Sequence, residues 1–251
     1  MPASNEERVY ANAAQTILRT PLNTMLRIRY RREGVERDTL AGISAYPKWF
    51  AKGGASRMIE NTRIYYLNPT DYTKADEARL AQMLSGAEGF IVDLRCGIAD
   101  DYNDFVRKYI VPDSISRGNL YTYPVLSLPG TFASEGRIAP KAEPAKGKIA
   151  GVVLVDNGTQ STLETHVQWL QSRADIVTVG TRSAGANGNV SWIVLPGDVR
   201  TCFSGLGWYD NDGEEIQRRG VRVDYPIPRT IEGVIAGRDE AFEKAIRLLQ
   251  K

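Results

Sequence analysis

Residues 149–170 read IAGVVLVDNGTQSTLETHVQWL, and this stretch decides the fold. Its first part, residues 149–155, is a short apolar run rich in β-branched side chains, which predicts a buried strand. The Asp156-Asn157-Gly158 segment that follows is a turn signal. From Leu163 onward apolar residues recur at helical spacing. We therefore predict a strand, a tight turn and a helix, with hydroxyl side chains on the turn.

A serine on such a turn has two uses. Ser161, or Thr159, can cap the helix, and Glu164 would then complete a capping box; this is the commonest use of these residue types. Alternatively, the Ser161 hydroxyl can attack a carbonyl carbon. The unpaired N–H groups of the first helical turn would then hold the oxyanion. The local pattern alone favours the cap.

Three segments in order resemble the carboxyl-terminal processing (tail-specific) serine peptidases, over residues 60–250. Residues 158–164 are similar to the family's Gly-Ser-Ala-Ser-Ala-Ser-Glu turn, in which the nucleophile precedes the glutamate by three residues; this position is Ser161. Residues 89–95 (GFIVDLR) resemble the family's Ile-Asp-Leu-Arg strand. Residues 209–224 resemble its Pro-Asp-Gly … Gly-Ile-Pro-Asp run. The resemblance shifts the balance toward a nucleophilic Ser161.

The resemblance also implies an architecture. We expect an α/β fold, a crotonase/ClpP-like spiral of ββα units, over residues 55–251, which would be the catalytic core. Residues 1–45 resemble the last third of a PDZ domain, a module that captures the C-terminus of the substrate in this family. Three arginines alternate along the expected strand at residues 24–31, and a solvated strand face is the favoured interpretation of them.

The resemblance assigns the oxyanion hole to two backbone N–H groups. One belongs to Thr162, and the other belongs to Gly97, the glycine that follows the Asp-Leu-Arg segment. Cys96 is a rival nucleophile, although a free cysteine is more often a small buried hydrophobic residue.

The general base is missing from its usual place. The family's lysine aligns with Ala186, and residues 181–188 contain neither Lys nor His. His166, the single histidine, follows Ser161 by five residues and so points away from it on a helix. Glu164 lies on the same face as Ser161, but a solvated carboxylate is a poor base for a serine. In the related tricorn-like branch the glutamate would fall near Gln217 or Glu215, and its histidine precedes the nucleophile.

Three functions remain open. The first is a serine peptidase that forms an acyl-enzyme at Ser161. The second is a non-catalytic homologue that binds extended peptides, because the polar stretch Ala184-Gly185-Ala186-Asn187-Gly188 resembles a branch without the lysine. The third and weakest is an acyl-CoA enzyme of the crotonase type.

Composition excludes several classes. The chain has 251 residues, a net charge of +2 and two cysteines, so neither a nucleic-acid partner nor a disulfide framework is expected. No apolar run is long enough to span a membrane, and the first 20 residues show no signal peptide. The family resemblance leads us to expect a periplasmic or extracellular protein that acts on peptides or proteins. We expect no metal or cofactor and leave the oligomeric state open.

Periodicity predicts the remaining elements. Helices are expected near residues 74–84, 100–109 and 238–249. Strands are expected at residues 24–31, 35–40, 62–67, 89–95, 121–128, 176–180, 190–195, 199–203 and 206–210. Residues 131–148 contain prolines, glycines and lysines and predict a mobile loop, either a cover over a site or a solvated connection.

Overall fold

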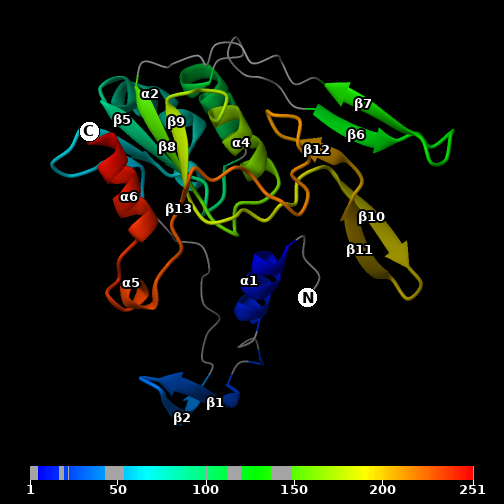
Figure 1. The fold of residues 1–251 in the computed structure, drawn as a ribbon, viewed down its shortest axis with the longest axis horizontal. Coiled ribbons are helices and arrows are strands. Elements are labelled where there is room, and N and C mark those ends of the chain that lie inside the picture. Colours follow the sequence, from blue (N-terminus) through cyan, green and yellow to red (C-terminus); the bar gives the residue numbers. More distant parts are fainter. Residues whose placement is uncertain are drawn as a thin grey trace.

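The computed structural model describes residues 5–16, 20–21, 23–42, 54–99, 101–111, 120–136 and 149–250, and every structural statement below concerns these residues. Figure 1 shows the arrangement of the elements. Residues 43–53, which include Trp49 and Phe50, lie outside them.

A sheet of six strands forms the centre. Its order is β13 (Tyr225–Pro226), β9 (Ile176–Gly180), β8 (Ala150–Val155), β5 (Gly89–Asp93), β4 (Ile64–Leu67) and β3 (Arg57–Met58). The first five strands are parallel, and β3 runs antiparallel at the edge. Parallel neighbours require crossovers, and helices supply them between β4 and β5 and between β8 and β9. The buried runs of β5 and β8 are therefore apolar on both faces.

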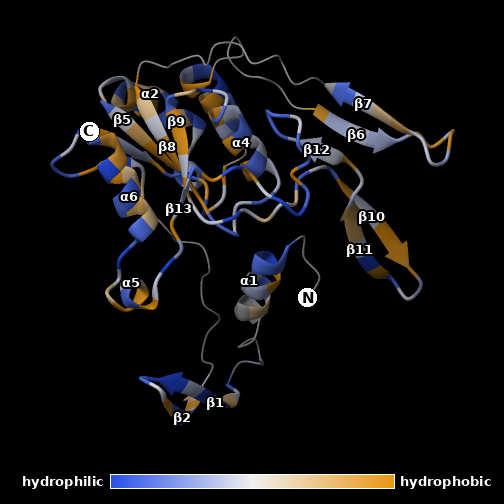
Figure 2. Ribbon diagram, in the orientation of Figure 1, coloured by the Kyte–Doolittle hydropathy of each residue, from blue (hydrophilic) through white to orange (hydrophobic). Residues whose placement is uncertain are grey.

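Alternate residues of these strands face two separate cores. On one face Val153 and Val155 pack with helices α2 (Glu77–Ser85), α3 (Tyr102–Phe105) and α4 (Thr162–Leu170). On the other face Val152 and Leu154 pack with α6 (Glu240–Leu249). Figure 1 shows α4 and α6 on opposite sides of β8 and β9, and Figure 2 shows the apolar colouring of these strands. The carboxyl ends of the five parallel strands thus meet at one edge, which is where the nucleophile turn lies.

Two smaller sheets stand beside this centre. The first has the order β12 (Gly207–Tyr209), β6 (Leu120–Pro124), β7 (Phe132–Gly136), and the second is the hairpin of β10 (Val190–Leu195) and β11 (Val199–Ser204). Residues 211–213 form a tight turn, across which the Asp210 N–H donates to the Glu214 carbonyl oxygen at 2.9 Å.

The N-terminal segment forms helix α1 (Glu6–Thr16) and the antiparallel hairpin of β1 (Met25–Arg32) and β2 (Val35–Gly42). The arginines of β1 are solvated, as expected, and Arg27, Arg29 and Arg31 form exposed ion pairs with Asp38 and Glu36. A hairpin after a helix is compatible with the PDZ-like interpretation, which stays a prediction, as do the domain boundaries at 45 and 55 and the spiral of ββα units.

The structure corrects several predicted elements. The strand expected at residues 121–128 is β6, which ends at Pro124 and is followed by a turn. Part of the loop expected at residues 131–148 is strand β7, which pairs with β6, and residues 137–148 lie outside the described range. The helix expected at residues 100–109 is α3 followed by a π-helical turn, Val106–Ile110. Neither the short helix α5 (Ile231–Ile235) nor strand β13 was expected. Both are too short for periodicity to reveal them.

Candidate active site

Ser161 lies on the turn between β8 and α4, as the sequence predicts. It is the residue before the first helical position, and its side chain is partly exposed. Thr159, the other candidate cap, is fully buried, and its hydroxyl donates to the Leu94 carbonyl oxygen at 2.9 Å. The Thr159 hydroxyl therefore links two strand ends, which leaves Ser161 as the reactive candidate on this turn.

The backbone of Ser161 is strained, with φ 58° and ψ −124°. Five other described residues that are not glycine also have positive φ. Asn23, Asn61 and Asp198 are of types that tolerate this region, whereas Glu33 and Arg218, like Ser161, are not. Such a conformation costs about 1–3 kcal/mol and persists only where the surroundings impose it. It is the backbone geometry expected of a nucleophile on a sharp strand-to-helix turn.

The Glu164 carboxylate imposes this conformation. It is fully buried and accepts four hydrogen bonds. One oxygen accepts from the Ser161 N–H at 3.2 Å and the Ala186 N–H at 3.0 Å. The other oxygen accepts from the Ser183 hydroxyl at 2.6 Å and the Gly185 N–H at 2.7 Å. The carboxylate thus joins the helix start to residues 183–186, and we call this arrangement the glutamate clamp.

The clamp corrects the sequence-based view of Glu164 as a solvated carboxylate. Burial raises its pKa, and the four hydrogen bonds oppose that rise. Because both oxygens already accept two hydrogen bonds each, Glu164 is not available as a base for the Ser161 hydroxyl. The predicted capping box of Ser161 and Glu164 is confirmed, and its glutamate half is the hydrogen bond that Glu164 accepts from the Ser161 N–H.

Glycines allow residues 180–186 to pass close to the turn. A Cβ atom on Gly180 would lie 1.9 Å from the Val155 carbonyl oxygen. Gly185 has φ +63°, and a Cβ atom there would lie 2.8 Å from the backbone of Arg218. The close approach lets the Ser161 N–H, which also donates to Glu164, donate a second hydrogen bond to the Ala186 carbonyl oxygen at 3.0 Å.

Helix α1 braces the same loop from outside. Asn5 precedes the helix and is buried, and its amide group donates to the carbonyl oxygens of Ser183 and Ala184 at 2.9 and 2.8 Å. Arg8 donates to the Asn157 carbonyl oxygen at 2.8 Å. The start of α1 therefore contacts both segments that flank Ser161, a feature that no local sequence pattern reveals.

The two predicted oxyanion donors occupy the same edge of the sheet. Thr162 is the first residue of α4, a position whose N–H has no acceptor within the helix. Gly97 has φ +127° on the turn after β5. That turn adjoins the nucleophile turn, because a Cβ atom on Gly158 would lie 3.2 Å from the Arg95 carbonyl oxygen. The assignment of Thr162 and Gly97 stays a prediction.

The Asp-Leu-Arg segment anchors that turn. Arg95 forms paired hydrogen bonds with Asp93 and also with Asp239 at the start of α6, at 2.7–2.9 Å. Burial alone would lower the pKa of Arg95, but the two carboxylates raise it. Asp93 also accepts from the Tyr66 hydroxyl at 2.9 Å. This buried network fixes the chain just before Gly97.

His166 points away from Ser161, as the helical spacing predicts. Its Nε2 pairs with the Asn103 side-chain oxygen, and its ring stacks against Tyr102 and Trp169. The ring is fully buried rather than at the core edge, and burial lowers its pKa to about 4. His166 is thus a neutral core side chain at pH 7 and not the base.

The two tricorn-like candidates differ: Glu215 is an exposed carboxylate, and Gln217 is an amide. Gln217 lies on a segment that crosses residues 183–186, which we call the clamp loop. There the Arg218 N–H donates to the Gly185 carbonyl oxygen at 2.7 Å. The Gln217 side-chain oxygen is buried without a hydrogen-bond partner. An amide cannot take up the proton of a serine hydroxyl, so this residue does not replace the missing base.

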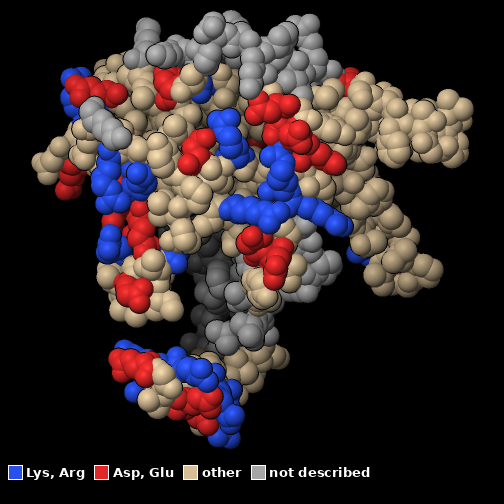
Figure 3. Space-filling model, viewed as in Figure 1, with Lys and Arg blue, Asp and Glu red and all other residues tan. Residues whose placement is uncertain are grey.

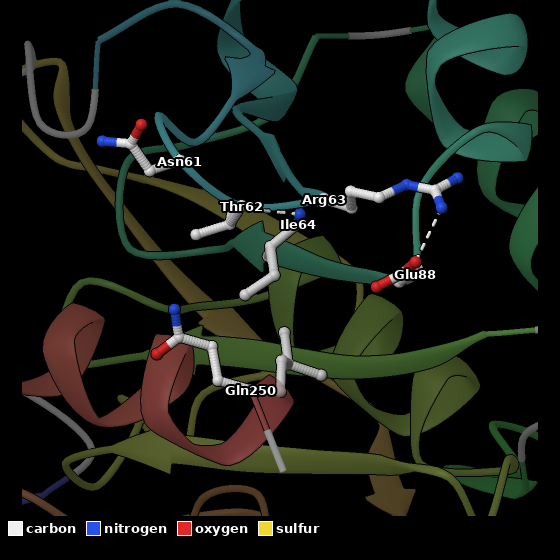
Figure 4. A pocket seen from close by; sticks show the side chains of 7 residues that line it. Asn61, Thr62, Arg63, Ile64, Glu88 and Gln250 are labelled. Atoms are coloured by element: carbon white, nitrogen blue, oxygen red, sulfur yellow. Dashed lines mark hydrogen bonds and ion pairs between the residues drawn. The ribbon is translucent and has the colours of Figure 1, made fainter.

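Two surface hollows lie at opposite ends of the parallel strands, and their positions can be compared with that of the Ser161 turn. One, of about 740 Å³, lies at the amino ends of β4 and β5, where Arg63 pairs with Glu88 (Figure 4). The other, of about 280 Å³, lies at the carboxyl ends and includes Asn157 and Arg95 in its wall. Ser161 lines neither. Ligands of parallel sheets bind at the carboxyl ends, so only the second hollow borders the candidate site.

The surface charges, the cysteines and the potential metal ligands of the described residues do not point to another kind of site. Acidic and basic side chains are interleaved on the face shown in Figure 3. Cys96 is buried, and neither it nor Cys202 forms a disulfide. In the part of the chain that the structure describes, no three His, Cys, Asp or Glu side chains are arranged to hold a metal ion, and no helix is long and apolar enough to cross a membrane.

Comparison with known proteins supports the family resemblance. The model of peptidase family S41 matches residues 125–227, which include Ser161 and the clamp loop but not Gly97. That family consists of serine peptidases. The match covers about two fifths of the chain. No curated protein matches the sequence significantly.

Solved structures support the fold. A candidate peptidase from Parabacteroides merdae is 18% identical, with a TM-score of 0.61 over 78% of this chain and 64% of its own. Mature CPAF, in complex with lactacystin, is 13% identical, with a TM-score of 0.62 over 97% of this chain and 72% of its own. The chain therefore spans about two thirds of the length of these proteins and shares their mixed α/β architecture.

Proposed function

We propose that this protein is a serine-type peptidase of the C-terminal processing kind, with Ser161 as its nucleophile. The observation that carries the proposal is the strained backbone of Ser161 on a strand-to-helix turn, held by the buried Glu164. A serine that only caps a helix does not need this conformation, because a capping serine normally has an extended backbone. The match to the S41 family, which spans this turn, supports the same conclusion.

In this proposal the Ser161 oxygen attacks the carbonyl carbon of a peptide bond. The backbone N–H groups of Thr162 and Gly97 donate to the developing oxyanion. The intermediate collapses to an ester at Ser161 and releases the amine product, and water then hydrolyses the ester. The base that accepts the serine proton is not assigned, because Glu164 and His166 are both engaged elsewhere.

A second candidate function follows because no base is assigned. A homologue without a base would bind extended peptides and not cut them. The observations that favour it are the neutral, distant His166 and the amide of Gln217 at one tricorn-like position. The family resemblance further leads us to propose a periplasmic or extracellular location. If residues 1–45 are PDZ-like, they would provide a second contact with the peptide.

One experiment separates the two candidates. The full chain and Ser161→Ala are incubated with a library of unstructured peptides, and new termini are identified by mass spectrometry while affinity is measured by calorimetry. A peptidase produces new termini that disappear in Ser161→Ala. A binding module gives equal affinity in both proteins and no new termini. Equal cleavage by both proteins would contradict the role of Ser161 in either account.

A further inference from the structure

Beyond the nucleophile turn, an aromatic hollow of about 500 Å³ lies where β6, β7 and β12 meet the chain that leaves the clamp loop. Three of its six lining residues are aromatic. Its walls are formed by Tyr121, Tyr123, Glu135, Asn189, Leu206 and Trp208. We call it the aromatic hollow.

Helix α4 connects this hollow to Ser161. Thr165 and Gln168 follow Ser161 by four and seven residues, so all three lie on one face of the helix. Thr165 accepts a hydrogen bond of 2.8 Å from Asn187, two residues before the hollow wall. Gln168 accepts one of 2.9 Å from the Trp208 indole N–H. Figure 1 shows β12 between α4 and β6. The hollow is thus fixed to the helix that begins at the nucleophile.

The rise of α4 from Ser161 to Gln168, which binds Trp208 of the hollow wall, matches the reach of a peptide. Seven residues of α-helix advance by about 10 Å. An extended peptide advances by about 3.3 Å per residue. A peptide whose reacting carbonyl lies at Ser161 would therefore bring the side chain about three residues away to the aromatic hollow.

The walls select the chemical class of that side chain. The Tyr121 and Trp208 rings stack with centroids 5.8 Å apart and planes 11° apart. The indole N–H is already bound by Gln168, so Trp208 offers only its apolar surface. Glu135 pairs across the strands with Tyr121 and accepts its hydroxyl hydrogen bond, which raises the pKa of Tyr121. The aromatic walls favour a large apolar or aromatic side chain. The Glu135 carboxylate, which is bound by Tyr121, disfavours an anion.

We infer that the aromatic hollow is a subsite for the substrate peptide, and that it accepts a large apolar side chain about three residues from the bond at Ser161. This inference rests on the proposed function for the register of the peptide. It goes further, because it names a specificity pocket that lies on different strands from the nucleophile.

The test uses the Ser161→Ala protein, so that binding is measured without turnover. Serine-alanine decapeptides carry one Phe, Lys or Asp at each position in turn, and their affinities are measured by calorimetry. We expect the best Phe peptide to bind at least about tenfold more tightly than its Asp counterpart. Tyr123→Ala and Leu206→Ala should each reduce this preference. A change in tryptophan emission on binding should disappear in Trp208→Phe.

The control is Phe132→Ala, which removes an exposed aromatic side chain from β7 outside the hollow and should leave the preference intact. A preference that survives Tyr123→Ala and Leu206→Ala, or a Lys peptide that binds more tightly than the Phe peptide, would overturn the inference. Labelling of Ser161 in the parent protein by a fluorophosphonate is measured separately. If Ser161 is labelled but no preference for Phe depends on the hollow, only the proposed subsite is contradicted. If the preference is found but Ser161 is not labelled, only the proposed nucleophile is contradicted.

Discussion

The carboxylate of Glu164 accepts a hydrogen bond of 3.2 Å from the backbone N–H of Ser161, three residues earlier in the chain. The same carboxylate holds residues 183–186, so the start of helix α4 and the neighbouring loop share one buried charged group. The position of the candidate nucleophile therefore depends on a side chain that cannot itself act as its base.

Glu164→Gln tests the clamp. The new amide group would face the N–H groups of Ser161 and Ala186, and a buried donor without an acceptor costs about 1–3 kcal/mol. We expect the free energy of unfolding, measured by urea titration, to fall by about 2–5 kcal/mol. Glu243→Gln changes a partly exposed carboxylate of α6, which pairs with Arg238, in the same way and is the matched control. A loss below about 1 kcal/mol at position 164 would show that the clamp contributes little.

The strain at Ser161 can be measured with two variants that both lack the hydroxyl. Glycine adopts positive φ without the penalty that a Cβ atom brings, whereas alanine keeps the penalty. Ser161→Gly should therefore be more stable than Ser161→Ala by about 1 kcal/mol, despite the greater chain entropy of unfolded glycine. If Ser161→Ala is the more stable variant in urea unfolding, the backbone at this position is not strained.

His166 should make stability depend on pH. Its pKa is about 4 in the folded protein and 6.5 in the unfolded chain, so the unfolded chain binds more protons between these values. Stability from this group is complete above pH 6.5 and is lost as the pH falls toward 4. We expect a loss of about 2 kcal/mol between pH 7.5 and 5 relative to His166→Gln, which does not titrate. Parallel stability curves for the two proteins would contradict this assignment.

Asn5 should couple helix α1 to the clamp loop. Its amide group bonds the carbonyls of Ser183 and Ala184, and its oxygen accepts from the Arg8 N–H. In Asn5→Ala we expect faster hydrogen exchange in residues 6–10 and also in residues 183–186, because both lose a buried partner. Glu6→Ala, an exposed change in the first turn of α1, should affect neither. Faster exchange confined to α1 would show that the helix does not brace the loop.

The central strands were predictable because their signals are local. The apolar runs of β5, β8 and β9 predicted strands, and the turn signal at residues 156–158 placed Ser161 ahead of helix α4. Strand β7 was missed because it is short and lies in a polar segment, and it becomes a strand only by pairing with β6. Tertiary contact, rather than propensity, decides such segments.

The site was predictable in its residues but not in its geometry. The Ser161-x-x-Glu164 spacing indicated a capping box, yet the donors that complete the clamp lie 19 to 22 residues later, and Asn5 contacts the loop from 178 residues away. Only the folded chain brings these groups together. The strained backbone was equally invisible, since serine is not a residue type that signals positive φ.

The most direct test of a nucleophilic Ser161 is covalent labelling of the folded protein with a fluorophosphonate. Trypsin would release residue 161 within the peptide Ile149–Arg173, in which fragmentation distinguishes Ser161 from its neighbouring threonines. The account predicts one adduct, on Ser161, that forms in the native state and is lost after denaturation in urea. An intact, unmodified Ser161 in the folded protein, or an adduct on another residue, would contradict it.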